Sequence, residues 1–109
     1  MRILETTSTL AAKAADGAGV AVNVAGFQCC VIQVTGTFVA DVEFKASVDG
    51  VTFFDIYGHN VGDSNHSYAK KVTAPKLIQF RDLGGIQFMR ADVANRASGA
   101  VTAIVAGIG

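Results

Sequence analysis

The sequence predicts an all-β protein, folded as an antiparallel β-sandwich or a jelly-roll-like barrel of about six to eight strands. Apolar and polar residues alternate with a period of two along several runs, which is typical of strands with one buried face. Turn residues separate these runs every ~8–12 residues. Fourteen Val, twelve Gly and a single Pro among 109 residues favour strands and turns. At this length the chain buries one core, so we expect one domain.

The first 19 residues differ from the rest. A short Ala-rich run is long enough for one helical turn, which Gly17 and Gly19 would end, and it is too short to hold a helix alone. We therefore expect residues 1–19 to be an N-terminal arm that is ordered only against another molecule, followed by one sandwich domain over residues 20–109. Glu5 and a run of Thr and Ser interrupt any signal-peptide core, so we expect synthesis and initial residence in a cytosol.

Two strands are predicted next. Residues 20–24 alternate Val with Ala and Asn, and residues 27–35 are almost continuously apolar, as expected of a strand covered on both faces. Polar residues and four glycines recur over residues 17–40, so we reject a membrane span there. The adjacent Cys29 and Cys30 would point to opposite faces of their strand, which predicts two small apolar fillers rather than a disulfide or a metal site.

The clearest alternation covers residues 41–48 and predicts a strand with one face in the core and one in water. Asp49-Gly50 follows directly. Because a type I′ turn needs positive φ at both central residues, this pair predicts a tight hairpin into a returning strand over residues 51–57. The apolar members of the alternation are Val42, Phe44, Ala46 and Val48.

The second half is predicted to hold a loop and three more strands. Residues 58–71 show no periodicity and are rich in Gly, Asn and Ser, which indicates a long loop. Strands are expected over residues 77–81 and 86–94, joined by a turn, and over residues 100–108, after another turn at residues 95–99.

The net charge of zero is a cancellation between the two halves of the chain. Residues 1–63 carry three basic and seven acidic residues, net −4, and residues 64–109 carry six basic and two acidic residues, net +4. Cross-strand pairing within one molecule explains this pattern, and a bipolar surface for packing against copies or a charged partner is the alternative. The lack of a basic excess argues against a nucleic-acid binder. Only 17% of the residues are charged, which is low for a surface that is fully exposed to water.

No catalytic constellation stands out. The sequence contains no nucleophile elbow, phosphate loop or zinc-protease motif. His59, Asp63 and His66 share the long loop, but their spacing matches no strong metal motif and no rigid element fixes them. We therefore expect a protein that is not an enzyme and that has no catalytic residue, metal or cofactor.

Aromatic residues are candidates for a binding surface. Phe53 and Phe54 are adjacent, so one should face the core and the other the opposite side. An exposed Phe54 or Tyr57 beside the long loop would serve as an interface anchor or as a platform for stacking a sugar ring. Alternatively, the domain packs both of these aromatic side chains.

Three segments carry a recurring pattern. In residues 44–54 a strand ends in Ser-Val-Asp-Gly and turns into a strand with aromatic residues near its start. Residues 80–90 place an aromatic residue, a turn and an apolar strand with Arg in succession, and residues 97–102 begin the last strand with Ser-Gly-Ala-Val. Over residues 31–108 the chain thus resembles small β-sandwich structural proteins of tailed-phage virions, among them capsid decoration or cement proteins and some tail-associated proteins. It departs from them in having two adjacent Phe residues where a Trp is common.

The resemblance implies a structural role in the virion. We expect a decoration or cement protein that binds and stabilises the assembled shell, made in the bacterial host cytoplasm and then part of the virion. Its expected partners are copies of itself, in a trimer, and the major capsid protein or another virion protein, with no nucleic acid and no membrane. A tail or neck component and a carbohydrate-binding β-sandwich module are the alternatives. The predicted interface draws on the arm, the aromatic residues and the long loop: Leu4, Leu10, Lys13, Phe54, Tyr57, His59, His66 and Tyr68.

Overall fold

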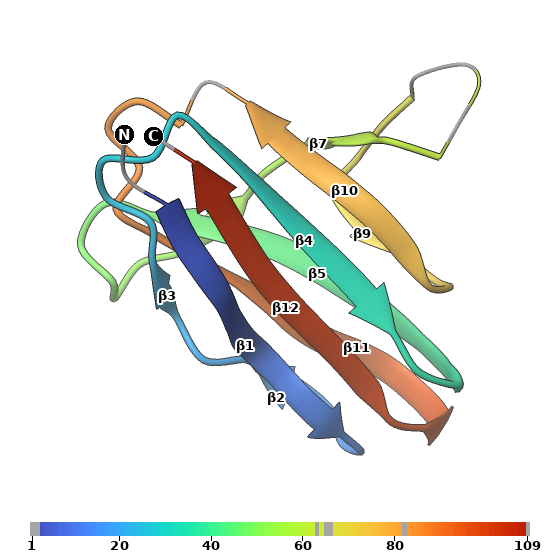
Figure 1. The fold of residues 1–109 in the computed structure, drawn as a ribbon. Helices are drawn as coiled ribbons and strands as arrows, with labels where there is room; N and C mark the ends of the chain where they lie inside the picture. The colour runs from blue at the N-terminus through green and yellow to red at the C-terminus, as the bar shows by residue number, and fades with distance from the viewer. Residues whose placement is uncertain (1–2, 63, 65–66, 82, 109) are drawn as a thin grey trace.

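Two antiparallel sheets pack face to face in the computed structural model (Figure 1). It describes residues 3–62, 64, 67–81 and 83–108, the first three of them by their backbone alone. Sheet A has the strand order β1 (Ile3–Lys13), β12 (Val101–Ile108), β4 (Cys29–Thr35), β10 (Lys76–Arg81), β7 (Gly58–Asn60) and β8 (Tyr68–Ala69). Sheet B has the order β2 (Gly17–Ala18), β11 (Phe88–Gly99), β5 (Phe38–Ser47) and β6 (Phe54–Asp55), with β3 (Val22–Asn23) against β11 and β9 (Lys71–Val72) against β5. The described strands form two open sheets, so the sandwich is confirmed and the barrel is not formed.

The body of the sandwich consists of six long strands. β1, β4, β5, β10, β11 and β12 each span six residues or more, whereas the other described strands are two or three residues long. The short strands lie along the edges of both sheets and extend the pairing of the long ones. Figure 1 shows β1, β12, β4 and β10 in front of β5 and β11, with both chain termini at the same end of the molecule.

The core lies between the two sheets. In β4, β10, β12 and the first half of β11 buried residues alternate with more exposed ones, as the period-two pattern predicts. The rings of Phe44 from sheet B and Phe80 from sheet A meet edge-on, with their centroids 5.4 Å apart. Gly58 allows β7 to lie close to Phe80, because a Cβ there would be 2.3 Å from Ile78 Cγ2 and 2.7 Å from Phe80 Cε1. The remaining large buried side chains include Leu10, Val24, Ile32, Val34, Val42, Leu83, Met89, Val101 and Val105.

The N-terminal segment is a strand of the sheet. Residues 3–13 form β1, which pairs antiparallel with β12, and Leu10 is 2% exposed within the core. Register shifts interrupt the pairing, and Ala12 takes a φ of 49°, which is typical of a bulged edge strand. The prediction of an arm, with a helical turn, that is ordered only against a neighbour is wrong for these residues. Pairing with the last strand already orders them within the chain.

Thr9 fastens β1 to sheet B. Its hydroxyl donates to the carbonyl of Val20 at 2.7 Å and accepts the N–H of Ala91 at 3.1 Å, while its own carbonyl accepts the Val20 N–H at 2.8 Å. Gly19 lies in the same contact and donates to the Ala91 carbonyl at 3.0 Å. A Cβ on Gly19 would lie 2.2 Å from that carbonyl oxygen, so this close approach requires glycine. These bonds join the first strand of sheet A to the second sheet.

The predicted type I′ turn is wrong. β5 and β6 do form a hairpin, with Lys45 opposite Asp55, but a six-residue loop over residues 48–53 connects them. Gly50 has a φ of 78°, whereas Asp49 keeps a negative φ, and a type I′ turn needs both to be positive. The alternation of buried and exposed residues predicted for residues 41–48 also stops where β5 ends, at Ser47.

Other boundaries shift as well. Residues 20–24 contribute only the short β3, and the predicted loop over residues 58–71 contains β7, β8 and β9. β7 and β8 pair with each other, and β7 also pairs with β10, so part of this segment extends sheet A. The predicted turn at residues 95–99 lies inside β11, where Asn95 takes a φ of 53° and the register against β5 shifts.

Candidate functional site

Two side chains shape the loop between β5 and β6. Ser47 Oγ donates to Asp49 Oδ1 at 2.8 Å and accepts the N–H groups of Asp49 and Gly50 at 3.2 and 2.9 Å. Asp49 Oδ1 in turn accepts the N–H groups of Thr52 and Val51 at 2.9 and 2.8 Å. The bond from Thr52, followed by those from Val51 and Ser47, favours the ionised carboxylate and lowers the pKa of Asp49 from its ordinary 3.8. The two side chains together therefore bond four successive backbone N–H groups of the loop.

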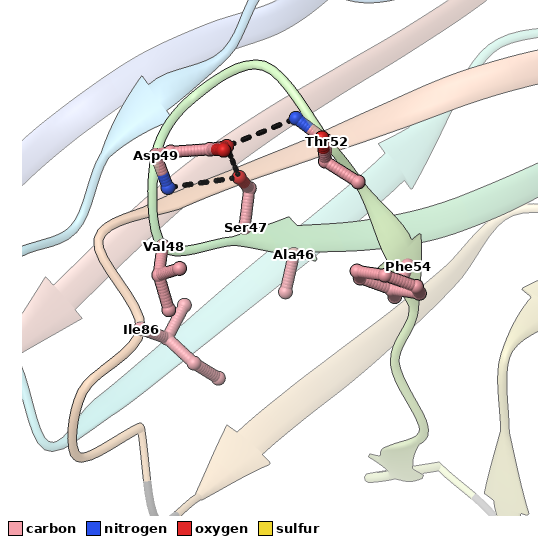
Figure 2. Close-up of a pocket in the computed structure, with 7 residues that line it drawn as sticks. All are labelled: Ala46, Ser47, Val48, Asp49, Thr52, Phe54 and Ile86. Atoms are coloured by element: carbon pink, nitrogen blue, oxygen red, sulfur yellow. Dashed lines mark hydrogen bonds between the residues drawn. The ribbon is translucent and has the colours of Figure 1, made fainter.

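An apolar pocket of about 260 Å³ lies beside this loop (Figure 2). Ala46 and Phe54 form part of its wall as cross-strand partners in β5 and β6. Figure 2 shows Val48 and Ile86 on one side of Ala46 and Phe54 on the other. We call this pocket the apolar notch; its lining is Ala46, Ser47, Val48, Asp49, Thr52, Phe54 and Ile86.

Large apolar side chains around the notch are exposed to solvent. Val48, Val51 and Phe54 are 69, 82 and 70% exposed, although they lie within seven residues of one another. Single exposed apolar residues are common on protein surfaces, whereas a cluster beside an apolar pocket is typical of an interaction site. The notch is thus a place where a partner can insert an apolar side chain.

The outer face of sheet A is a second candidate surface. Cross-strand partners share a face, so the register identifies its members across all six strands. Arg81, at the end of β10, is the one residue of this face with a formal charge among those that the structure describes. The outward residues are Ser8, Thr102, Ile104, Ala106, Ile108, Cys29, Val31, Gln33, Thr35, Leu77, Gln79, Arg81, His59 and Tyr68.

The outer face of sheet B has the opposite character. Lys45 accounts for two of its ion pairs, and its contact with Asp55 raises the pKa of the lysine and lowers that of the aspartate. The pKa of Asp41 is lowered mainly by a hydrogen bond from Asn95. The ion pairs recorded among the described residues are Lys45–Glu43 (3.6 Å), Lys45–Asp55, Lys70–Asp55 (3.5 Å), Lys71–Asp41 (3.5 Å) and Arg90–Asp92 (2.9 Å).

These pairs explain the charge pattern of the sequence. Lys70–Asp55 and Lys71–Asp41 each join the positive half of the chain to the negative half, as pairing within one molecule predicts. Arg90 also lies 3.9 Å from the centroid of the Phe53 ring, which it covers. The charged side chains of this face are therefore largely neutralised by their neighbours on the same face.

The predicted interface residues fall in different places. Phe54 lines the notch, and Tyr57, 60% exposed, precedes β7. His59 and Tyr68 lie together on the outer face of sheet A, with their rings 5.9 Å apart and edge-on. Neither Phe53 nor Phe54 is a core residue, because Phe53 is half-buried under Arg90 and Phe54 is 70% exposed.

The arm residues do not form a surface together. Leu10 is a core residue, which is a correction to its predicted place in an interface. Lys13 is half-buried at the end of β1. Leu4 is placed by its backbone in β1, and its side chain lies outside the described residues, as does His66 altogether.

Of the seven residues that line the notch, Phe54 alone is among the predicted interface residues. Val48 is assigned to the core by the alternation, but β5 ends at Ser47, so Val48 is 69% exposed and Ser47 is 5% exposed. Ile86 approaches from a loop that is distant in the sequence, and only the fold brings it beside Val48. The signal that points to the notch is the Ser-Val-Asp-Gly turn, whose side-chain hydrogen bonds stop the strand.

The cysteines and the histidines of the long loop form no shared site in the described part of the chain. Cys29 and Cys30 are both free thiols on opposite faces of β4, as predicted. Burial, with a smaller contribution from Cys29, raises the pKa of Cys30 to about 11. Of His59, Asp63 and His66, whose spacing argued against a metal site, Asp63 and His66 lie outside the described residues, and no cluster of three His, Cys, Asp or Glu side chains occurs among those described.

Within the described ranges, no helix is long and apolar enough to cross a membrane.

The fold is shared with two proteins of known structure. The SPBc2 prophage-derived protein YomS matches with a TM-score of 0.81 at 15% sequence identity, over 100% of this chain and 96% of that protein. The PBSX exported protein XepA matches with a TM-score of 0.83 at 18% identity, over 99% of this chain and 38% of that protein. At these identities the likeness shows a common fold. No protein-family model and no curated protein sequence matches the chain.

Proposed function

We propose that this chain is a structural protein of a phage virion, of the capsid decoration type, which attaches to the assembled particle and catalyses no reaction. The observation that carries the proposal is the apolar notch with exposed Val48, Val51 and Phe54 around it. The fold it shares with the phage-derived YomS and XepA supports a phage origin, and the resemblance of the hairpin segments to virion proteins supports the virion as its location.

Attachment through the notch relies on the burial of apolar surface. Phe54 and Val51 lose their contact with water when a partner covers them, which contributes about 25 cal/mol per Å² of buried apolar area. An aromatic anchor beside a pocket is typical of the few residues that carry most of the binding energy of an interface. A protein that binds only the assembled shell stabilises that shell by mass action.

The experiment measures binding of purified variants to phage particles that lack the protein. Val51→Asp and Phe54→Ala should each weaken binding by roughly tenfold or more, which corresponds to about 1.4 kcal/mol. Val39→Asp is the matched control, because Val39 is 59% exposed at the opposite end of β5. Wild-type binding by the notch variants, or an equal loss in the control, would contradict the proposal.

A protein of the tail or neck could attach through the same notch, at another part of the virion. The notch variants test attachment wherever it occurs, so position needs a separate measurement. Gold-labelled antibody against the bound protein should mark the capsid if the chain is a decoration protein. Label confined to the tail or to the neck would assign it there instead.

Export from the cell is a second candidate. The observation that favours it is the match to XepA, which is described as an exported protein and of which this chain spans 38%. An exported protein would be found free in the medium of a lysed culture. A virion protein sediments with the particles, so fractionation separates the two candidates.

A further inference from the structure

Two Asp-Gly pairs occur in the sequence, Asp16-Gly17 and Asp49-Gly50. Such a pair can rearrange without an enzyme. The glycine nitrogen attacks the aspartate Cγ and loses its proton, and one carboxyl oxygen leaves as water, which closes a succinimide ring. Water then adds to either carbonyl of the ring. The product is aspartate again, or isoaspartate, in which the main chain runs through the side-chain carboxyl carbon. Glycine favours the reaction because it has no side chain to obstruct the ring.

Ring closure depends on the freedom of both reacting groups. The carboxyl group must turn toward the following nitrogen, and the two reacting atoms must come within about 3–3.5 Å in an aligned position. The departing oxygen also needs a proton, because it leaves as water. Hydrogen bonds that fix the carboxylate or the glycine N–H therefore slow the reaction. The fold thus decides which of the two pairs reacts.

The loop between β5 and β6 fixes both reacting groups of its pair. Asp49 Oδ1 accepts the Ser47 hydroxyl at 2.8 Å and the N–H groups of Val51 and Thr52 at 2.8 and 2.9 Å. The Gly50 N–H donates to Ser47 Oγ at 2.9 Å, so the nitrogen that would attack is bound to a different side chain. These bonds to the carboxylate, led by the one from Thr52, also lower the pKa of Asp49 and keep the group ionised. Ring closure here requires all of these hydrogen bonds to break.

The pair in β2 is held less firmly. Asp16 and Gly17 are both exposed to solvent. Within the described part of the chain, the Asp16 carboxylate has one hydrogen bond, from the N–H of Arg96 at 2.9 Å. Gly17 pairs with Val93 of β11, but β2 is a two-residue strand at the edge of sheet B. Short edge strands open locally at a low cost in free energy. The Asp16 carboxyl and the Gly17 nitrogen therefore become free together more often than the groups of the loop.

We propose that Asp16-Gly17 is the site at which the folded protein forms isoaspartate, and that the β5–β6 loop protects Asp49-Gly50. The proposal concerns a chemical change of the chain itself and does not depend on what the notch binds. Isoaspartate lengthens the main chain by a carbon atom. At position 16 it would displace the acceptor of the Arg96 N–H and disturb the pairing of β2 with β11. At position 49 it would disrupt the loop that shapes the notch, so protection of this pair preserves the notch.

Peptide mapping by mass spectrometry, with a fragmentation method that distinguishes isoaspartate from aspartate, follows both pairs in one sample. The folded wild-type protein is incubated at about pH 5, where an ordinary aspartate carboxyl is still protonated in part. Isoaspartate should accumulate at position 16 roughly tenfold faster than at position 49, or more. In guanidinium chloride, which removes the fold, the two rates should become similar. Asp16→Glu cannot close the same ring and should abolish the isoaspartate signal of β2.

Ser47→Ala tests the protection directly. It removes the hydroxyl that binds both Asp49 and the Gly50 N–H, so the rate at position 49 should rise while the rate at position 16 stays the same. Ser8→Ala is the matched control, because the Ser8 hydroxyl donates to the Leu10 carbonyl within β1, and it should leave both rates unchanged. Circular dichroism checks that each variant is folded. If Ser47→Ala does not fold, the comparison of the two positions in the wild type decides.

Three results would overturn the proposal. The first is isoaspartate that forms at position 49 of the folded wild type as fast as at position 16, or faster. The second is a position 16 that stays unchanged in the folded protein while the denatured protein reacts. The third is a folded Ser47→Ala variant in which the rate at position 49 does not rise. None of these measurements involves particles, so each outcome is independent of the proposed function.

Discussion

Asp49 is a single side chain whose charge helps to hold a whole loop. Its Oδ1 accepts two backbone N–H groups, and Ser47 Oγ accepts two more. Such local bonds compete with strand pairing and end β5 at Ser47. The loop that results places Val48 and Val51 in solvent.

The lowered pKa of Asp49 makes this loop sensitive to acid. A carboxyl group whose pKa is lowered by folding stabilises the protein above the ordinary pKa, and that contribution is lost as pH falls through the lowered value. The melting temperature of the wild type should therefore fall between about pH 5 and about pH 2. Asp49→Asn keeps an acceptor oxygen and should show a smaller fall, the remainder coming from Asp41 and Asp55, whose pKa values are also lowered. Identical pH dependence in the two proteins would show that Asp49 does not contribute.

Gly58 tests the packing of the core against β7. Gly58→Ala places a methyl group 2.3 Å from Ile78 Cγ2, so the free energy of unfolding should drop by about 1–3 kcal/mol in urea titrations. Gly84→Ala is the control, because nothing lies within 4 Å of a Cβ at Gly84. Equal stability of the two variants would mean that β7 does not lie close to the core.

β1 shows which elements a local pattern can reveal. The strands over β4, β5, β10 and β12 were predictable, because each carries its own run of apolar or alternating residues. β1 carries Ser and Thr and buries Leu10 against the core at an edge, and its pairing with β12 joins residues from opposite ends of the chain. Because the two strands lie about 90 residues apart in the sequence, no local pattern reveals their pairing. The residues of β1 alone therefore favoured the interpretation as an arm.

Hydrogen exchange distinguishes a strand from an arm. Amide groups of β1 that bond to β12 should exchange slowly, within an order of magnitude of those in β4. Thr9→Val should speed the exchange of β1 and lower the free energy of unfolding by about 1–3 kcal/mol, because it leaves the Ala91 N–H and the Val20 carbonyl without the Thr9 hydroxyl. Fast exchange of all β1 amides in the wild type would contradict the strand and support the predicted N-terminal arm.

Charge is distributed unevenly over the part of the molecule that the structure describes. Among the described residues, the outer face of sheet B carries several ion pairs and the outer face of sheet A carries one charged residue, Arg81. The notch adds an exposed apolar site at the β5–β6 loop. Composition alone predicted that part of the surface is covered, since few residues are charged. It did not reveal the notch, because the notch unites the hairpin at residues 46–54 with the distant Ile86 and depends on the exact end of β5.

Salt dependence follows from this arrangement. Binding to particles through the notch buries apolar groups, so raising NaCl from about 0.1 to about 0.5 M should leave the affinity within roughly threefold of its starting value. Binding through charged groups would weaken steeply over the same range. A steep loss would place the contact on the outer face of sheet B instead of the notch.

The copy number of the chain in purified particles decides whether it is a virion structural protein. Quantitative mass spectrometry of gradient-purified phage, with the major capsid protein as internal reference, gives this number. We expect many copies per particle, in fixed ratio to the capsid protein. Absence from the particles, with the protein recovered from the cleared medium, would contradict the account and favour export.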